Sequence, residues 1–196
     1  MRGNAGENIF KANRDREAFL SYLEATAERF GIIIYSYCLM TNHYHLLIET
    51  PQANLSAAIQ WLNVSYATWF NKKRRRRGHL FQGRFKAILV DADEYLNQVS
   101  RYIHLNPVKA KIVETPQAYA WSSYPVFIGE KEKPDWLDTA LLAYFGKQQK
   151  SAIRNYRAFV EEIDIDTLKS RQAECQWLYF WGGGFCPLDS GHLFIR

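Results

Sequence analysis

The stretch His43-Tyr44-His45-Leu46-Leu47-Ile48-Glu49 decides how the middle of this chain folds. Residues 32–38 precede it, and their β-branched and aromatic side chains predict a buried strand that turns back at Thr41-Asn42. Because residues i and i+2 of a strand project from the same face, His43 and His45 point to one spot, about 6–7 Å apart along the strand. Two neutral imidazoles in this arrangement are able to hold one divalent cation.

A second pair of polar side chains lies at the end of a predicted helix over residues 94–105. Tyr102 and Asn106 are four residues apart, so that a phenol and an amide oxygen are neighbours on one helix face. Pro107 is expected to end the helix just beyond Asn106. If this pair meets the two histidines, the site has three metal ligands and one nucleophile, which is enough to cut a phosphodiester bond.

Each of these residues also has a purely structural interpretation. Histidines on a strand are often core or surface groups, most of the twelve tyrosines must serve packing, and an asparagine before a proline is often a helix-end residue. Another histidine, His104, points away from Tyr102 on the helix, and we expect it to be structural or solvent-facing. It is the combination of residues that favours a site.

Helical and extended patterns alternate along the first part of the chain. They predict the order helix, strand, strand, helix, strand, helix over residues 13–30, 32–38, 43–49, 55–69, 85–90 and 94–105. This order predicts an α+β fold with a mainly antiparallel sheet and helices on one or both faces. Beyond residues 121–124, helical patterns over 137–145 and 153–163 predict an extension, which divides the chain into a domain at 1–130 and a C-terminal extension at 131–196.

The composition favours a protein of the reducing cytoplasm. No apolar stretch approaches the roughly 18 residues of a membrane span, and the first residues lack the apolar region of a signal peptide. The three cysteines, Cys38, Cys175 and Cys186, are too few and too scattered to predict a disulfide framework or a zinc ribbon. The sequence leaves a monomer and a dimer equally open.

The surplus positive charge lies in one segment, residues 72–77, which reads Lys-Lys-Arg-Arg-Arg-Arg. Setting these six aside leaves 19 of the 25 basic residues against 20 acidic ones. A solvated loop is one interpretation, and a phosphate-binding stripe is the other, because such a cluster attracts polyanions. Residues 78–86 add further cations and aromatic rings that suit stacking on unpaired bases. The candidate DNA-binding residues are Lys72, Lys73, Arg74, Arg75, Arg76, Arg77, Arg84 and Lys86.

Four ordered motifs resemble the single-tyrosine HUH transposases, and most closely the REP-associated tyrosine transposases. The resemblance covers about residues 2–130 and implies a ferredoxin-like sheet, with the histidines on a central strand and the tyrosine on a helix packed beside it. The motifs are Cys-Leu-Met-Thr-Asn-His-Tyr-His-Leu-Leu at 38–47, Gly-His-Leu-Phe-Gln-Gly-Arg-Phe-Lys at 78–86, Tyr-Ile-His-Leu-Asn-Pro-Val-Lys at 102–109 and Trp-Ser-Ser-Tyr at 121–124.

The resemblance also implies a reaction and the residues that carry it out. His43 and His45 match the paired metal-binding histidines, Asn106 the polar ligand and Tyr102 the nucleophile. The implied reaction is cleavage and rejoining of single-stranded DNA near a hairpin through a 5′-phosphotyrosine, and mixed nitrogen and oxygen ligation suits Mg²⁺ or Mn²⁺. Two other interpretations stay open: a non-catalytic DNA-hairpin-binding protein from a decayed transposase copy, and a structural remnant.

Both ends of the chain depart from the family pattern. Relatives usually carry another strand before the segment that matches Arg2-Gly3-Asn4, and this strand lies beside the histidine strand in a ferredoxin-like sheet. We expect its absence to leave unpaired backbone groups beside the site, so that the chain folds poorly or lacks cleavage activity without an upstream segment. The tail at residues 175–185 does not match the family and is either a genuine extension or the product of a shifted reading frame.

Overall fold

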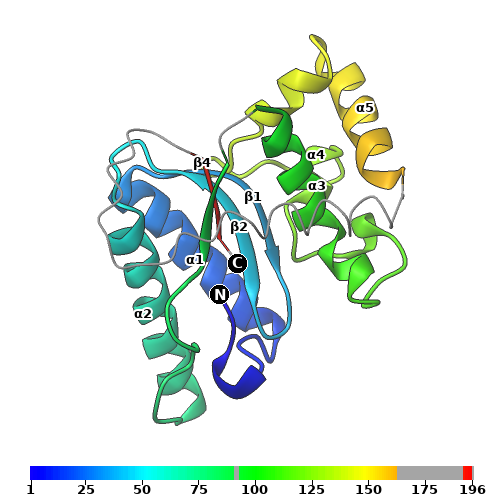
Figure 1. Cartoon of the computed structure of the whole chain (residues 1–196). Helices are drawn as coiled ribbons and strands as arrows, with labels where there is room; N and C mark the ends of the chain where they lie inside the picture. Colours follow the sequence, from blue (N-terminus) through cyan, green and yellow to red (C-terminus); the bar gives the residue numbers. More distant parts are fainter. Residues whose placement is uncertain (91–92, 163–191, 196) are drawn as a thin grey trace.

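A four-stranded antiparallel sheet with helices on both faces forms the centre of the computed structural model, which describes residues 1–90, 93–162 and 192–195 (Figure 1). This arrangement confirms the predicted α+β class. The strands are β1 (Ile33–Leu39), β2 (Tyr44–Glu49), β3 (Ala87–Val90) and β4 (His192–Ile195). The helices are α1 (Asn13–Phe30), α2 (Leu55–Arg74), α3 (Asp93–Lys109), α4 (Tyr124–Phe127) and α5 (Gln149–Glu161), with short 3-10 turns at Asn4–Gly6, Pro116–Ala118 and Ala140–Phe145.

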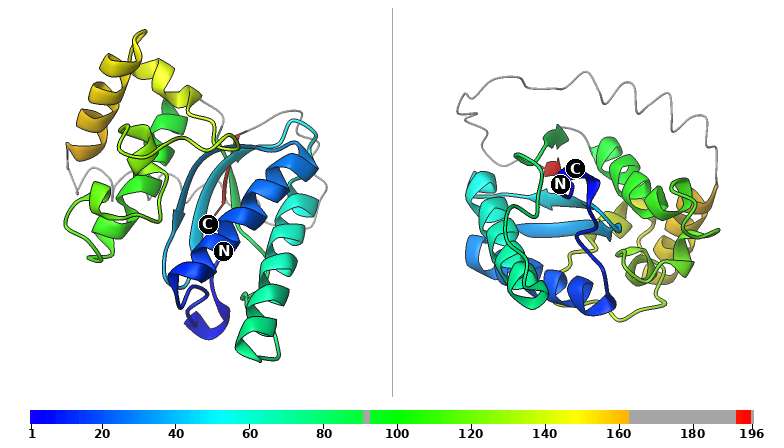
Figure 2. Two further views of the ribbon diagram at one scale, coloured as in Figure 1. Left: turned by 180° about the vertical axis from the view of Figure 1, so that it is seen from behind. Right: turned by 90° about the horizontal axis from the view of Figure 1, so that it is seen from below.

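The two faces of the sheet are buried against different helices (Figure 2). The side chains of Tyr44, Leu46 and Ile48 on β2 join a core that α1 and α2 cover. Leu47 joins the second core, which α3, α4 and α5 share. Because side chains alternate along a strand, His45 lies on the same face as Leu47, toward α3.

The place beside β2 that we expected to lack a strand is occupied by β4. The strand order is β1-β2-β4-β3, and β4 runs antiparallel to both of its neighbours. Ile195 pairs with Leu46, and the carbonyl of Met1 accepts the amide hydrogen of Tyr44 (3.2 Å) further along β2. The first and last described residues therefore lie in line along β2, and they are close together in all views (Figures 1 and 2). The expected row of unpaired backbone groups beside the site is thus not found.

The N-terminal segment is fixed on both sides by backbone hydrogen bonds. The amide of Gly3 donates to the carbonyl of Asn42 (2.7 Å), and the amide of Asn4 donates to the carbonyl of Leu80 (2.9 Å). A β-carbon at position 3 would lie 2.1 Å from the carbonyl oxygen of Glu7, so this close approach requires glycine. The segment therefore joins the turn before β2 to the chain that leads into β3.

Pro107 does not end α3, contrary to the prediction from the sequence. The helix continues to Lys109, and the amide of Ala110 still donates to the carbonyl of Asn106 (2.9 Å). A proline removes its own amide hydrogen and disturbs the preceding turn, but it leaves the amides that follow it intact. The helical path ends near Lys111, which takes a left-handed backbone conformation with φ of 55°.

Residues beyond 130 contribute both to the core that α3 covers and to the sheet. Tyr156 and Val160 of α5 are buried in the same core as Ile103 of α3, and β4 lies inside the sheet. The tail at 175–185 lies outside the described residues. The described helices include none with the length and apolar character needed to cross a membrane.

Candidate active site

The two histidines lie side by side, His43 directly before β2 and His45 within it, on the face that α3 covers. The centroids of the His43 and His45 rings are 4.8 Å apart, and the ring planes are nearly perpendicular at 87°. His45 is 1% exposed, whereas His43 is partly exposed at the edge of the site. The predicted convergence of the two imidazoles is confirmed.

Asn42 sets the orientation and tautomer of His43. Nδ1 of His43 lies 2.7 Å from Oδ1 of Asn42, and the amide nitrogen of Asn42 donates to the carbonyl of Gly6 (3.3 Å). An amide oxygen only accepts hydrogen bonds, so Nδ1 of His43 must carry the hydrogen. In the neutral ring this leaves the lone pair on Nε2, which is the arrangement found in metal-binding histidines.

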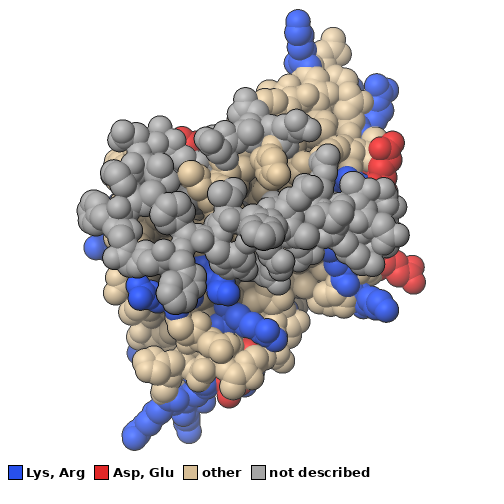
Figure 3. Space-filling view, in the orientation of Figure 1, with Lys and Arg blue, Asp and Glu red and all other residues tan. Residues whose placement is uncertain are grey.

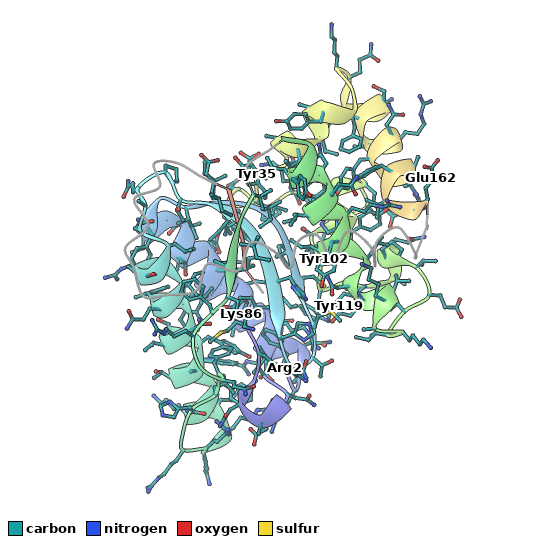
Figure 4. The ribbon with its side chains drawn as sticks, in the orientation of Figure 1. Arg2, Tyr35, Lys86, Tyr102, Tyr119 and Glu162 are labelled. Carbon is teal, nitrogen blue, oxygen red and sulfur yellow. The ribbon has the colours of Figure 1, made fainter. Side chains whose placement is uncertain are left out.

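Tyr102 reaches the histidines from α3. Its ring centroid lies 5.8 Å from that of His45, with the ring planes at 87°. The ring is partly buried and packs against the core under α3, and Figure 4 places it between this helix and the strands. The packing of α3 on β1 and β2 therefore brings together two motifs that are far apart in the sequence.

Asn106 lies one helical turn beyond Tyr102, as predicted. Its amide nitrogen donates to the backbone carbonyl of Tyr102 (2.8 Å), and the side chain is 9% exposed. This hydrogen bond uses the donor end of the amide, so that Oδ1 is the end suited to bind a cation.

The donor set fits a hard or borderline divalent cation. The described part of the chain contains no group of three or more His, Cys, Asp or Glu side chains placed to hold a metal ion. The site therefore offers two imidazole nitrogens from His43 and His45, and an amide oxygen from Asn106 as the candidate third ligand. Such a set with water in the remaining positions suits Mg²⁺ or Mn²⁺.

Two residues near the site were not singled out from the sequence. Asn42 was interpreted only as part of a turn. Lys109 was given no role beyond its place in the motif at 102–109, yet its Nζ lies 4.4 Å from the centroid of the Tyr102 ring. Seven residues are almost two full helical turns, so the spacing of Tyr102 and Lys109 would have placed both on one face if the helix had been predicted to pass Pro107.

His104 is structural and not part of the site. It is fully buried, with Nε2 2.8 Å from Oγ of Ser123 and Nδ1 2.8 Å from the hydroxyl of Tyr156. Oγ of Ser123 also accepts the amide hydrogen of Tyr37 in β1 (3.0 Å). Burial lowers the pKa of His104 to about 3, so the ring is neutral. These contacts tie α3 to β1 and α5, and so fix the helix that carries Tyr102.

The basic segment is partly folded into the end of α2. Lys73 and Arg74 form ion pairs with the buried Asp15 at 2.6 and 2.7 Å, and Arg76 pairs with Glu7 at 2.8 Å. The other three cations of the segment are exposed and form no ion pair within the described residues: Lys72, Arg75 and Arg77. Figure 3 shows basic side chains at the end of α2 and across the middle of this face, with few acidic ones between them.

Comparison with known proteins places these motifs in one family. The family model described as "Transposase IS200 like" matches residues 2–106, which include both histidines, Tyr102 and Asn106. A Haemophilus influenzae protein whose name describes it as a REP-associated tyrosine transposase is 29% identical over 117 residues, covering 54% of this chain and 66% of the relative, just under two thirds of that protein. No solved structure matches the chain. With more than half of its length matched by the family model, the chain belongs to the IS200-like transposases.

Proposed function

We propose that the chain is a metal-dependent single-strand DNA transposase that cleaves and rejoins DNA near hairpins through a 5′-phosphotyrosine. The observation that carries this proposal is the meeting of Tyr102 with the histidine pair, 5.8 Å between the ring centroids of Tyr102 and His45. A phenol beside two imidazoles is the combination that this reaction needs. Membership of the family supports the same assignment.

The metal-binding residues in this proposal are His43, His45 and Asn106. When bound by these residues, Mg²⁺ or Mn²⁺ would supply positive charge for polarising the scissile phosphate and stabilising the leaving oxygen. Asn42 orients His43 with the ring lone pair on Nε2, since Nδ1 of that ring donates to Oδ1 of Asn42 (2.7 Å).

Tyr102 is the nucleophile. Its hydroxyl oxygen forms a bond to phosphorus, the bond between phosphorus and the 3′ oxygen breaks, and the phenolic proton is lost while the 3′ oxygen gains one. The products are a 5′-phosphotyrosine and a free 3′-OH. Because the phosphoester is conserved, a second 3′-OH is able to reverse the reaction and join a new strand without an external energy source.

The DNA partner is proposed to lie over the basic end of α2 and the segment that leads into β3. Lys72, Arg75 and Arg77 are exposed at the end of α2, and Arg84 and Lys86 are exposed further along. Phosphate contacts by such cations give binding that is strong at low salt and insensitive to sequence.

The experiment uses a pool of single-stranded hairpin oligonucleotides with randomised flanks, incubated with the full chain and Mg²⁺ or Mn²⁺. One half of the pool carries a fluorophore at the 3′ end and the other half at the 5′ end. A 5′-phosphotyrosine keeps the part of the DNA that lies 3′ of the cut, so only the 3′ label should stay on the protein in a denaturing gel. Chelation of the metal should abolish the labelled band.

The other outcomes decide between the remaining interpretations. Retention of the 5′ label would show that the protein is joined to the 3′ end of the upstream fragment, which contradicts a 5′-phosphotyrosine. Tight binding of hairpins without any covalent band in either metal would favour the non-catalytic DNA-hairpin-binding protein. Neither binding nor a covalent band would favour the structural remnant.

A further inference from the structure

Lys109 lies directly against the proposed nucleophile. Its Nζ is 4.4 Å from the centroid of the Tyr102 ring, which is within the range of a cation–π contact. His45 meets the same ring with its plane at 87°. The ring of Tyr102 is therefore contacted by an imidazole of β2 and by the ammonium group of its own helix.

Lys109 is half-buried and lies near a second positive charge, that of Arg101. Among the residues that the structure describes, no acidic side chain forms an ion pair with Lys109. Burial and the neighbouring charge of Arg101 lower the pKa of Lys109 to about 8, so the amine is still mainly protonated at neutral pH. A half-buried cation of this kind is stabilised when an anion arrives.

We infer that Lys109 is a positioning residue of the cleavage reaction, which holds the Tyr102 ring for attack and stabilises the negative charge that develops as its hydroxyl oxygen loses the proton. This inference rests on the proposed function, because the anion that completes the arrangement is the reacting phenol and the phosphate beside it. A cation on the face of an aromatic ring is attracted by the π-electrons. This attraction grows stronger as the phenol loses its proton and becomes anionic.

The continuation of α3 past Pro107 is what delivers this group. If the helix ended at Asn106, Lys109 would have no fixed place relative to Tyr102. The hydrogen bond from the Ala110 amide to the Asn106 carbonyl (2.9 Å) keeps the last turn helical and holds Lys109 two turns beyond Tyr102. The helical turn that follows the proline therefore places Lys109 beside the Tyr102 ring.

The test compares three variants of the full chain. Lys109→Met removes the charge and keeps the length of the side chain, Lys109→Arg keeps a cation that is able to contact the ring, and Lys111→Met removes an exposed charge from the same helix end as a control. Single-turnover formation of the covalent product and the Kd for a hairpin oligonucleotide are measured for each. In parallel, 3-fluorotyrosine replaces Tyr102, and its ¹⁹F resonance is recorded without DNA.

Lys109→Met is expected to slow covalent product formation by roughly tenfold or more while the Kd changes by less than about threefold. Lys109→Arg should restore most of the rate, and Lys111→Met should match the parent chain. The chemical shift of the ¹⁹F resonance should change in Lys109→Met and remain unchanged in Lys111→Met.

Equal rates in Lys109→Met and Lys111→Met, or a rate loss that Lys109→Arg does not relieve, would overturn the inference. If the parent chain forms no covalent product, the proposed function fails instead. An unmoved ¹⁹F resonance in Lys109→Met would overturn the inference on its own, whatever the activity.

Discussion

In the proposed metal site, cation binding depends on the rings of His43 and His45. Their centroids are 4.8 Å apart, and Asn42 fixes the tautomer of the outer one. We predict that His43→Ala and His45→Ala each weaken Mn²⁺ binding by roughly 10- to 100-fold or more and reduce cleavage accordingly. Isothermal titration with Mn²⁺ measures this, with the exposed His79→Ala as control. Unchanged affinity in both strand variants would remove the proposed metal site.

His104 is predicted to affect stability and its pH dependence instead of the chemistry. The pKa of the buried ring is lowered to about 3, against about 6.5 for a free histidine. Below about pH 6.5 the unfolded chain therefore binds a proton that the native chain does not, and stability falls as the pH drops from there toward 3. At pH 5 this single group should cost roughly 2 kcal/mol of unfolding free energy relative to pH 7.5.

Urea unfolding at pH 7.5 and 5 measures this effect in the parent chain and in His104→Gln. The variant should be less stable at pH 7.5, because Tyr156 and Ser123 each lose a buried hydrogen-bond partner. Its stability should also change less between the two pH values. Equal pH dependence in the two proteins would show that His104 is not held neutral in the native state.

At the scale of elements, the end of α2 carries some cations that are paired with a buried carboxylate and others that are exposed to solvent. Lys73 and Arg74 neutralise the fully buried Asp15, which also accepts the amide hydrogens of Lys11 and Ala12 at the start of α1. Burial alone would raise the pKa of Asp15, but the hydrogen bonds from Lys73, Lys11 and Arg74 outweigh it and the pKa ends below its usual value. These two cations therefore join α1 to α2.

We predict that substitutions in the two sets of cations have separable effects. The triple variant Lys72→Gln, Arg75→Gln and Arg77→Gln should keep the melting temperature and flatten the log–log salt dependence of single-strand binding by about 2 units, at about 0.7 per phosphate contact. The double variant Lys73→Gln and Arg74→Gln should instead lower the melting temperature, since it leaves a buried carboxylate without charge partners. Thermal unfolding and binding titrations over a range of salt concentrations measure both. An unchanged slope in the triple variant would place the DNA path elsewhere.

At the scale of the whole molecule, the sheet is completed by β4 from the far end of the chain. Leu193 pairs with Ile48 on one side and Leu89 on the other. We predict that Leu193→Pro, which removes a backbone donor from this interior strand, lowers the unfolding free energy by about 1–3 kcal/mol and reduces cleavage with it. Leu193→Ala keeps the amide hydrogen and serves as control for the backbone effect. Equal unfolding curves for the proline and alanine variants would show that β4 does not pair with β2 in solution.

Much of the site was predictable because its signals are local. The alternation of side chains along a strand placed His43 and His45 on one face. The four-residue spacing on a helix placed Asn106 beside Tyr102. The remaining features depend on contacts between distant segments. Ile195 pairs with Leu46, which lies far from it in the sequence. No pattern within a single segment of the sequence predicts this pairing.

Two features of the structure differ from what simple sequence rules suggest. Pro107 predicts a helix end by local rules, but the amides that follow it resume the helix as far as Lys109. The six consecutive cations appear equivalent in the sequence, and only the position of Asp15 on another helix separates Lys73 and Arg74 from the rest. The first difference lies in local backbone hydrogen bonds, and the second depends on a tertiary contact between α1 and α2.

The central claim is that Tyr102 forms a covalent bond to DNA, and peptide mapping of the cleavage product tests it most directly. The parent chain, Tyr102→Phe and Tyr95→Phe are incubated with the hairpin pool and Mn²⁺, digested with nuclease and protease, and analysed by mass spectrometry. Tyr95 is 47% exposed on the same helix and serves as the matched control. The proposal predicts a nucleotide-bearing peptide that contains Tyr102 in the parent chain and in Tyr95→Phe, and none in Tyr102→Phe, whose binding to the hairpin stays nearly unchanged. A covalent product that persists at full yield in Tyr102→Phe would contradict it.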